Sequence, residues 1–492
     1  MSRPWQGVVR AVAVLASGGA LVAASLQVPG TLSLGTPLSA MAEAGPRLVA
    51  VQSASLSCPG PETEGLANVP PVAGVTTVLA AAAPAPALAG VDLSGAGPGR
   101  LGVQSTPSGT VLGQTDQRAV VVSGTLQGAS VGQVTANGSL APGTGALQTW
   151  LRTQGDDRAL VTTACTVARA DQWLVAGGGE STRRERLVVT NPGANSVSAD
   201  VTVLGAGGPI ASANGKNVAV PPHGRVTLLL DALVGPENTP VVHVAATGGV
   251  VTAVLQDSWI DGAVGRGADD ATPTDDPATE QVIPAAFVGG PSRVRIGVPG
   301  SDESVVQVRV LTATGPQALP GEGVVRVPAG AVRDVDLSAL PAGAYAVQVR
   351  SDHPVVAGAM LERRGDGKGQ SDFAWTASTA PIPVMTGTPL PAAVTGTLML
   401  VGTGAPAGAT VVTVSAAGAV ASRDVAVSAD SVAVVDVSGL SQVWVLRTAG
   451  TLRAGVALTL ADQAGAPPLF SIVPLGPLPV SVLQVPAREV RR

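Results

Sequence analysis

Three histidines, His223, His243 and His353, are the side chains of this sequence best suited to transferring protons near neutral pH. In hydrolases a histidine activates a serine hydroxyl beside an aspartate, and such a triad assembles in space rather than along the sequence. No Gly-x-Ser-x-Gly elbow lies at an expected strand-to-helix turn, where it would present a nucleophile. We therefore interpret the histidines as turn or surface residues, and we expect no catalytic residue and no enzyme activity.

An acidic stretch at residues 269–280 offers oxygen ligands of the kind that calcium prefers. The stretch lacks the regular spacing and the turn glycine of a calcium-binding loop, and Pro273 and Pro277 interrupt it. Two cysteines and three dispersed histidines are too few for a zinc site. We expect no metal ion and no cofactor, and we interpret the stretch as a solvated loop between two repeats.

Polar, glycine-containing insertions recur at one position of the repeats described below, for example at residues 362–372, and are shorter at 461–465. Insertions at one recurrent position lie on one face of a repeat array, where binding residues are often found. The residues that we predict to bind a partner are Asp257, Trp259, Glu362, Arg363, Arg364 and Asp366. Tryptophans could also stack on sugars, but in a chain with 2% aromatic residues we expect them to anchor cores or seams between units.

The elements that must position these residues are short β-strands that repeat along the chain. Apolar residues alternate with polar ones over 197–204 and again over 304–311, which is typical of a sheet with one solvated face. Val201, Pro221 and Leu233 correspond to Val308, Pro328 and Leu340 at one constant offset of 107 residues. A third unit starting near residue 396 keeps the later strands. Such a repeat predicts several similar β units.

Each unit ends with a paired apolar run, at residues 241–255, 345–359 and 443–457. We interpret these runs as β-hairpins with bends at 248–249, 352–353 and 449–450. Six or seven short strands in about a hundred residues favour tandem antiparallel β-sandwiches of the immunoglobulin-like type. A β-propeller is the alternative, with each repeat forming a double blade.

Composition and charge bear on the compartment and the partners. The net charge of -5 is spread without long runs, which argues against a nucleic-acid partner. Arg3 and Arg10 precede an apolar segment up to Val28, which predicts a signal anchor or a cleaved signal peptide. In an exported chain, the isolated pair Cys58 and Cys165 predicts one disulfide, with two buried thiols as the alternative.

The segments Trp173-Leu-Val-Ala-Gly-Gly, Leu187-Val-Val-Thr-Asn-Pro192 and Pro354-Val-Val-Ala resemble an extracellular β repeat of bacterial envelope proteins. The whole chain resembles an uncharacterised family of secreted or membrane-anchored proteins from high-GC Gram-positive bacteria. The Asn-Pro pair becomes Val298-Pro299 in the second unit and is absent from the third. The resemblance implies an envelope location and a β fold, and it brings no catalytic residues.

These observations predict an all-β protein with a signal anchor or signal peptide (1–28), a linker (29–45), an N-terminal β domain (46–170) and three β-sandwich repeats (171–281, 282–381 and 382–492). We expect a non-catalytic scaffold or interaction protein of the cell envelope, on the extracytoplasmic side of the membrane or secreted. A carbohydrate- or peptidoglycan-binding module is the alternative. The expected partners are an envelope protein or glycan, and the membrane through the N-terminal segment.

Overall fold

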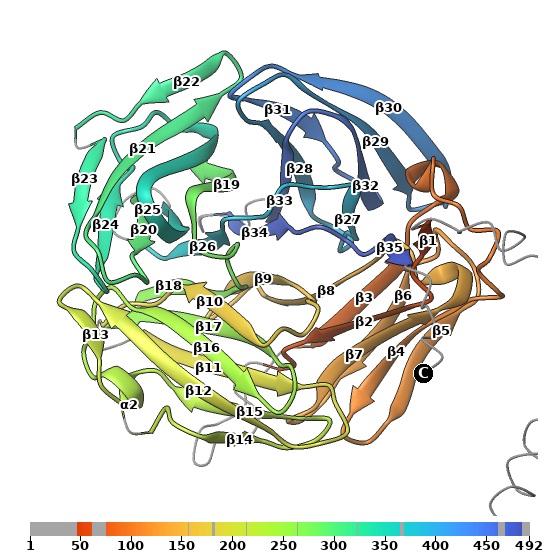
Figure 1. Ribbon diagram of the computed structural model, residues 1–492, viewed down its shortest axis with the longest axis horizontal. Coiled ribbons are helices and arrows are strands. Elements are labelled where there is room, and N and C mark those ends of the chain that lie inside the picture. The colour runs from red at the N-terminus through yellow and green to blue at the C-terminus, as the bar shows by residue number, and fades with distance from the viewer. Residues whose placement is uncertain are drawn as a thin grey trace, which may run out of the picture. The chain divides into compact units, whose positions relative to one another are not determined.

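The computed structural model describes residues 47–61, 75–155, 157–179, 183–212, 214–262, 264–321, 323–364, 369–460 and 468–484. Nearly all regular structure in them is β-strand, besides the short turns η2 (Ala85–Leu88), η3 (Gly138–Leu140) and α2 (Asp231–Val234). The described strands form antiparallel sheets that close into neither a barrel nor a propeller (Figure 1). The predicted all-β, sandwich-like fold is therefore confirmed.

The predicted anchor (1–28) and the predicted linker (29–45) lie outside the described residues, which begin with the first strand. Among the described residues, no helix has the length and apolar character needed to cross a membrane. The segment Val49–Val482 forms one compact unit. At its two ends the Val51 N–H donates a hydrogen bond to the Val480 carbonyl at 3.0 Å, so the beginning and the end of the unit are joined.

The first two sheet pairs are built from residues 53–164 and 171–271. In the first pair the sheets are β2 (Ser53–Cys58), β7 (Val131–Asn137), β4 (Arg100–Thr106) and β5 (Thr110–Thr115), and β6 (Val122–Leu126), β3 (Thr76–Ala82), β8 (Thr144–Arg152) and β9 (Ala159–Ala164). In the second pair they are β10 (Asp171–Val175), β16 (Val241–Thr247), β12 (Val197–Gly205), β13 (Gly208–Ile210) and β14 (Val218–Val220), and β15 (Gly224–Leu229), β11 (Arg183–Asn191), β17 (Thr252–Asp261) and β18 (Val264–Ala271).

The other two sheet pairs are built from residues 278–377 and 385–475. The third pair contains β19 (Ala278–Val288), β20 (Ser292–Gly297), β21 (Ser304–Thr312), β22 (Gly315–Ala318), β23 (Val324–Val327), β24 (Val332–Asp336), β25 (Gly343–Arg364) and β26 (Ser371–Ala377). The fourth contains β27 (Met385–Pro389), β32 (Leu440–Ala449), β29 (Ala407–Ser415) and β30 (Val420–Val427), and β31 (Ser431–Asp436), β28 (Thr395–Gly402), β33 (Leu452–Leu460) and β34 (Leu469–Leu475). Two further strands, β1 (Arg47–Ala50) and β35 (Ser481–Gln484), pair with each other.

The closing runs of the repeats are not hairpins, which corrects the expectation from sequence. In the second pair β16 bonds to β10 and β12, whereas β17 bonds to β11 and β18 in the other sheet. In the third pair the long strand β25 does the same without a break, since its first half pairs with β19 and β21 and its second half with β20 and β26. The chain therefore crosses from one sheet to the other at this point, as strands do at sandwich corners.

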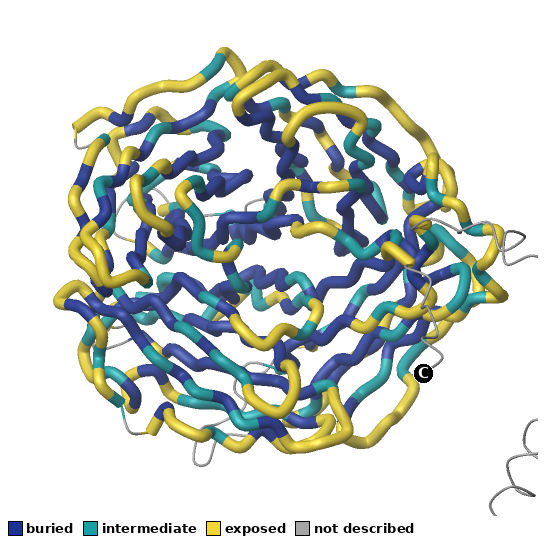
Figure 2. The backbone as a smooth tube through the Cα atoms, viewed as in Figure 1, coloured by how far each residue is buried: buried dark blue, intermediate teal, exposed yellow. Residues whose placement is uncertain are grey.

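The last strand of each pair, β9, β18, β26 or β34, lies at the edge of one of its sheets, and these four strands contact one another. We call them the central strands. β9 contacts β18, β18 contacts β26, β26 contacts β34, and β34 contacts β9 (Figure 1). They are almost wholly buried, whereas outer edge strands such as β30 are mostly exposed (Figure 2). Packing of the central strands joins four sheet pairs into one compact unit.

The hydrophobic cores also extend from one sheet pair into the next. Phe373 and Trp375 of the third pair pack in the core of the second, and Phe470 of the fourth packs in the core of the third. Leu160 of the first pair packs in the core of the fourth. The second, third and fourth pairs therefore each have large side chains of a neighbouring pair in their cores, whereas the core of the first pair is built from its own residues between Val51 and Cys165.

Candidate functional site

Four of the six predicted binding residues lie along the seam between the second and third sheet pairs. Asp257 and Trp259 are on β17, and Glu362, Arg363 and Arg364 are on β25. Asp366 lies outside the described residues. Asp257 and Glu362 are only 1% and 2% exposed, so these two carboxylates face the interior rather than a loop surface.

A buried guanidinium is at the centre of this seam. Arg183 on β11 forms a two-point ion pair with Asp257, with Nε–Oδ1 at 2.8 Å and Nη2–Oδ2 at 2.5 Å. The indole Nε1 of Trp375 donates to the same carboxylate at 2.7 Å from the third sheet pair. The guanidinium also lies over the rings of Trp259 and Phe373, at 5.2 and 5.3 Å. Asp257 and Trp259 therefore hold a structural arginine in place.

A carboxyl group with an unusual pKa lies beside this ion pair. Burial of Glu185 raises its pKa to about 8, and the nearby Asp257 carboxylate acts in the same direction. Arg183, with Nε 3.6 Å from Glu185, opposes the rise, and the Gly178 N–H donates to the carboxyl group. Glu185 also lines a cavity of about 290 Å³ together with Asp231. The group can exchange a proton near neutral pH, which is a property shared by functional and structural buried carboxyls.

A second arginine crosses the same seam in the opposite direction. Arg295 on β20 forms a two-point ion pair with Asp334, at 2.8 and 3.0 Å. Its remaining N–H groups donate to carbonyls of the second sheet pair, including Gly177 at 2.7 Å and Asn238 at 3.0 Å. The side chain is fully buried, so its hydrogen bonds fix the position of one sheet pair against the next.

The other predicted binding residues form a partly exposed cluster farther along the seam. Arg364 forms a two-point ion pair with Glu362, at 2.9 and 3.0 Å. Arg266 lies 4.0 Å from Glu362 and pairs with Asp261 at 2.8 Å, and its guanidinium lies over the Trp259 ring at 5.7 Å. The structure thus brings residues from β17, β18 and β25 together.

Arg363 points to a different seam. Its guanidinium lies 4.6 Å from the ring centroid of Phe470 on β34 and 5.4 Å from that of Phe287 on β19. Burial lowers the pKa of this guanidinium. Arg363 therefore packs at the contact between the third and fourth sheet pairs instead of joining Glu362 and Arg364.

Buried carboxyl groups on the central strands bond to the backbones of neighbouring strands. Asp269 on β18 accepts the Trp375 N–H of β26 at 2.7 Å, and Asp372 on β26 accepts the Phe470 N–H of β34 at 2.9 Å. Burial raises the pKa of both carboxyl groups well above the usual value, although these N–H donors act in the opposite direction. The central strands do not pair with one another through backbone hydrogen bonds in the described structure. The carboxyl groups instead accept backbone N–H groups of the neighbouring central strand.

The interpretation of residues 269–280 as a solvated loop was wrong for most of its length. Asp269 and Asp270 are buried on β18, and the stretch ends inside β19. Charge and proline content made the segment look solvated, but backbone N–H groups of another sheet pair satisfy Asp269. Gly267 is the one nearby residue that indicates close packing of this segment. Its φ is +110°, and its missing Cβ leaves room for Asp372.

One histidine does lie between an acid and a hydroxyl. His243 on β16 stacks on Trp173, with ring centroids 4.1 Å apart, and its Nε2 is 2.8 Å from Asp171 Oδ2. Its Nδ1 is 3.4 Å from Thr202 Oγ1. The three strands place these side chains in a cross-strand row, because Trp173 and Thr202 are both register partners of His243. The row lies on a sheet face, and the contact to Thr202 is long for a hydrogen bond.

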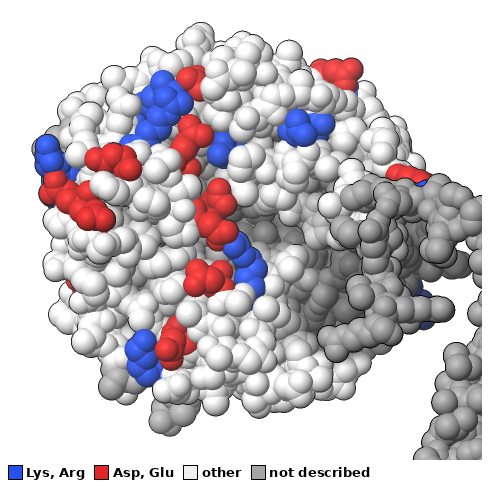
Figure 3. Space-filling view, in the orientation of Figure 1, with Lys and Arg blue, Asp and Glu red and all other residues white. Residues whose placement is uncertain are grey.

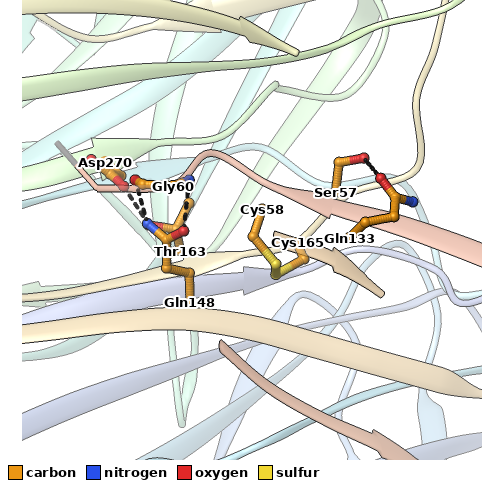
Figure 4. Close-up of a disulfide and its surroundings, with 8 residues drawn as sticks. All are labelled: Ser57, Cys58, Gly60, Gln133, Gln148, Thr163, Cys165 and Asp270. Carbon is orange, nitrogen blue, oxygen red and sulfur yellow. Dashed lines mark hydrogen bonds between the residues drawn. A yellow bond between two sulfur atoms is a disulfide. The ribbon is translucent and has the colours of Figure 1, made fainter. Parts of the chain in front are cut away.

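The predicted disulfide is present between Cys58 and Cys165, and it joins β2 to the segment after β9 (Figure 4). Near it, Gln148 and the Gly60 backbone exchange two hydrogen bonds, at 2.8 and 3.0 Å. Beyond the disulfide, Arg225 of the second sheet pair donates to the Pro59 carbonyl at 2.7 Å. The disulfide therefore holds the segment through which the first sheet pair contacts the second.

Comparison with known proteins gives a family and no activity. A family model described as "Family of unknown function (DUF5719)" matches residues 120–438. No curated protein matches the chain. A crystal structure of Thermotoga maritima 1070 matches 21% of this chain and 94% of its own, with 16% identity and a TM-score of 0.19. A tetra-tandem repeat in the extending region of a large adhesion protein matches 76% of this chain and 91% of its own, with 15% identity and a TM-score of 0.10.

Proposed function

The chain belongs to the family of unknown function DUF5719, and we propose that it is a non-catalytic scaffold or interaction protein of the cell envelope, located outside the cytoplasm. The observation that carries this proposal is that the buried charged side chains bond within the chain itself. Arg183, Asp257, Arg295 and Asp372 bond to other parts of the same chain and hold sheet pairs together. A rigid multi-part body is what a scaffold needs in order to present its surface to partners.

The tryptophans support the same proposal. Trp150, Trp375 and Trp444 are 4%, 1% and 0% exposed, and Trp173 and Trp259 are half-buried against His243 and Arg183. Indole rings packed in this way stabilise cores and seams and are not free to stack on a glycan chain. Acidic and basic side chains are interspersed on the face shown in Figure 3, which suits a polar protein partner.

The location outside the cytoplasm rests on two features. The Cys58–Cys165 disulfide is typical of an oxidising compartment. The basic and apolar N-terminal segment up to Val28 is typical of an export signal. With the resemblance to secreted or membrane-anchored proteins of high-GC Gram-positive bacteria, these features favour an envelope protein held by an N-terminal anchor, or secreted after its cleavage.

A carbohydrate- or peptidoglycan-binding role is the second candidate. The observation in its favour is a pocket lined by hydroxyl side chains at the ends of the central strands, which is described in the next subsection. A site of this kind does not require exposed tryptophans.

A capture experiment tests the scaffold role. The full chain carrying a C-terminal tag is immobilised and exposed to a detergent-solubilised envelope fraction, before and after digestion of its glycans. We expect the same envelope proteins to be captured in both cases. Capture that disappears after glycan digestion would contradict the scaffold role. Mass measurement of the non-reduced protein from cells additionally tests retention of the N-terminal segment.

A further inference from the structure

A pocket of about 220 Å³ lies where all four central strands end. β9, β18, β26 and β34 end at residues 164, 271, 377 and 475, and the segments that follow each of them line the pocket. These segments contribute, among others, Thr166, Thr274, Ser378 and Gly476. The pocket is therefore built jointly by the four sheet pairs and is complete only in the folded unit.

Hydroxyl groups dominate the polar side chains of this wall. The serine and threonine residues that line it are Thr166, Thr272, Thr274, Ser378, Thr379, Thr386 and Thr388. The residues Ser378, Thr379 and Thr388 are 1%, 6% and 3% exposed, and their hydroxyl oxygens have no hydrogen-bond partner within the described parts of the chain. The hydroxyl of Thr166, which also lines the pocket, is a fourth without a partner in the described structure. Buried polar groups are nearly always hydrogen-bonded in proteins, so four such hydroxyls around one pocket support a ligand site there.

The charges at the pocket balance each other. Arg169 and Asp275 line it, and Arg169 is already paired with the Asp276 carboxylate. Asp275 bonds to the backbone N–H of Asp276 at 3.0 Å. Asp276 neutralises Arg169, and burial raises the pKa of Asp275, so neither lining charge strongly favours an ionic ligand. Uncharged ligands are therefore favoured over phosphates or free amino acids.

The rest of the wall is apolar and rigid. Pro273, Pro474, Pro477 and Pro479 line the pocket, and the disulfide through Cys165 fixes one side of it. A sugar ring has hydroxyl groups at its rim and C–H groups on its faces, which matches hydroxyl groups beside proline rings. The volume is below that of a pocket for a drug-sized molecule, and it suits a single small ring.

We propose that this pocket binds one uncharged sugar residue, as the end of a glycan or as a free monosaccharide. The inference names the ligand for the second proposed function and is independent of the scaffold role. Ser378, Thr379 and Thr388 would donate to and accept from sugar hydroxyls after rotation about χ1, and the proline rings would contact the ring C–H groups. Because hydroxyls both donate and accept, such a site matches a polyhydroxy ligand better than a peptide backbone.

The test is a binding titration of the purified full chain with glucose and with N-acetylglucosamine, followed by calorimetry and by ligand-observed NMR. We expect millimolar affinity for at least one sugar, since only a few hydrogen bonds are formed. Glucose 6-phosphate and diglycine serve as charged and peptide probes, and we expect weaker binding of both. Tighter binding of either probe, or no binding of either sugar, would overturn the proposal.

Two pocket variants locate the binding. Gly476 lines the pocket, and a Cβ added there meets no atom within 4 Å, so Gly476→Phe adds a bulky ring to the pocket wall with no clash at its Cβ. We expect it to abolish sugar binding, whereas Gly300→Phe, at an equally open glycine outside the pocket, keeps it. Unchanged binding by Gly476→Phe would refute the site. Thermal unfolding of each variant verifies that it is folded.

A second variant removes hydroxyls instead of volume. The double change Ser378→Ala and Thr379→Val is expected to weaken sugar binding about tenfold, which corresponds to loss of one or two hydrogen bonds. Thr190→Val is the matched control, because Thr190 is also buried without a hydroxyl partner in the described structure but does not line the pocket. Equal effects of the two changes would refute a specific role of the pocket hydroxyls. Envelope-protein capture is a separate readout, so failure of the pocket and failure of the scaffold role are distinguishable.

Discussion

The seam between the second and third sheet pairs and the seam between the fourth and the first are held by different chemistry. In the former, Arg183 and Arg295 are fully buried and bond to carboxylates, carbonyls and aromatic rings. In the latter, Thr162 and Ser471 bond through hydroxyl and backbone groups at 2.8 and 3.1 Å, although they are 309 residues apart. The side-chain amide of Gln442 donates a further hydrogen bond to the Ala119 carbonyl at 2.6 Å.

The difference follows from what each seam must overcome. Sheet pairs that are neighbours in sequence are connected by a short segment, so little chain entropy opposes their contact. That contact tolerates the desolvation of guanidinium and carboxylate groups, which specify one geometry when fully paired. The fourth and first pairs are far apart in sequence, so more chain entropy opposes their contact. Their seam uses neutral hydroxyl and amide groups, which cost less free energy to bury than charged groups do.

The largest expected effect comes from breaking the charged seam. Asp257→Ala leaves the Arg183 guanidinium buried without its carboxylate and removes the acceptor of the Trp375 indole. We expect a loss of about 3–5 kcal/mol in the free energy of unfolding, measured by urea denaturation. The double change Arg183→Met and Asp257→Leu is the control and should cost less than Asp257→Ala. An equal or larger loss would contradict the ion-pair explanation.

Removal of the disulfide is expected to come next. It closes a loop with a sequence separation of 107 residues and holds the first sheet pair against the second. The double change Cys58→Ala and Cys165→Ala should lower the free energy of unfolding by about 2–5 kcal/mol, because the unfolded chain gains freedom. The same protein under reducing conditions should match the variant. A variant as stable as the oxidised parent would contradict this role.

The stability of the charged seam is expected to depend on pH, because it contains Glu185, whose pKa is raised to about 8. A carboxyl with a raised pKa binds a proton more tightly in the folded state, so its contribution to stability is greatest at low pH and is lost as pH rises from about 4.5 to about 8. One proton corresponds to a slope of at most about 1.4 kcal/mol per pH unit. Glu185→Gln should flatten the urea-denaturation profile between pH 5 and 8, and an unchanged slope would assign the effect to other groups.

The neutral seam should show a smaller loss. Ser471→Ala removes the hydroxyl that bonds to Thr162 and to Asp269 Oδ1, and it leaves the Thr162 N–H without its acceptor. We expect a loss of about 1–3 kcal/mol in the free energy of unfolding. Hydrogen exchange of the β9 and β34 amides should become faster before that of the β11 amides. If exchange at β11 became faster first, this would contradict the expectation that Ser471→Ala weakens the neutral seam before the charged one.

The smallest effect is expected at the exposed ion pair between Arg326 and Glu303, whose side chains are 72% and 50% exposed. Arg326→Ala should change the free energy of unfolding by less than about 1 kcal/mol, because solvent screens the pair. The measurement is the same urea denaturation as for Asp257→Ala. A loss comparable to that of Asp257→Ala would show that burial is not what separates the two ion pairs.

The strands and their repeat were predictable because their signals are local. Alternation over residues 197–204 reappears as the alternating burial of β12, and Val201 and Val308 have corresponding register partners, Val244 and Val349. The disulfide was predictable because the sequence has only two cysteines and begins with a segment typical of an export signal. Of the predicted binding residues on β17 and β25, all but Arg363 meet at the seam between the second and third sheet pairs. Nothing in the sequence indicates that Asp257 and Glu362 are buried.

Local patterns in the sequence specify where strands form, which face of each is apolar, and which segments repeat, since these depend on residues a few positions apart. Three features arise only from long-range contacts: the closing runs cross between sheets, Asp269 and Asp372 lie inside the unit, and four strand ends form one pocket. The physical reason is that a buried polar group needs a partner. Here the partners, such as the Trp375 and Phe470 N–H groups, are supplied by strands about a hundred residues away.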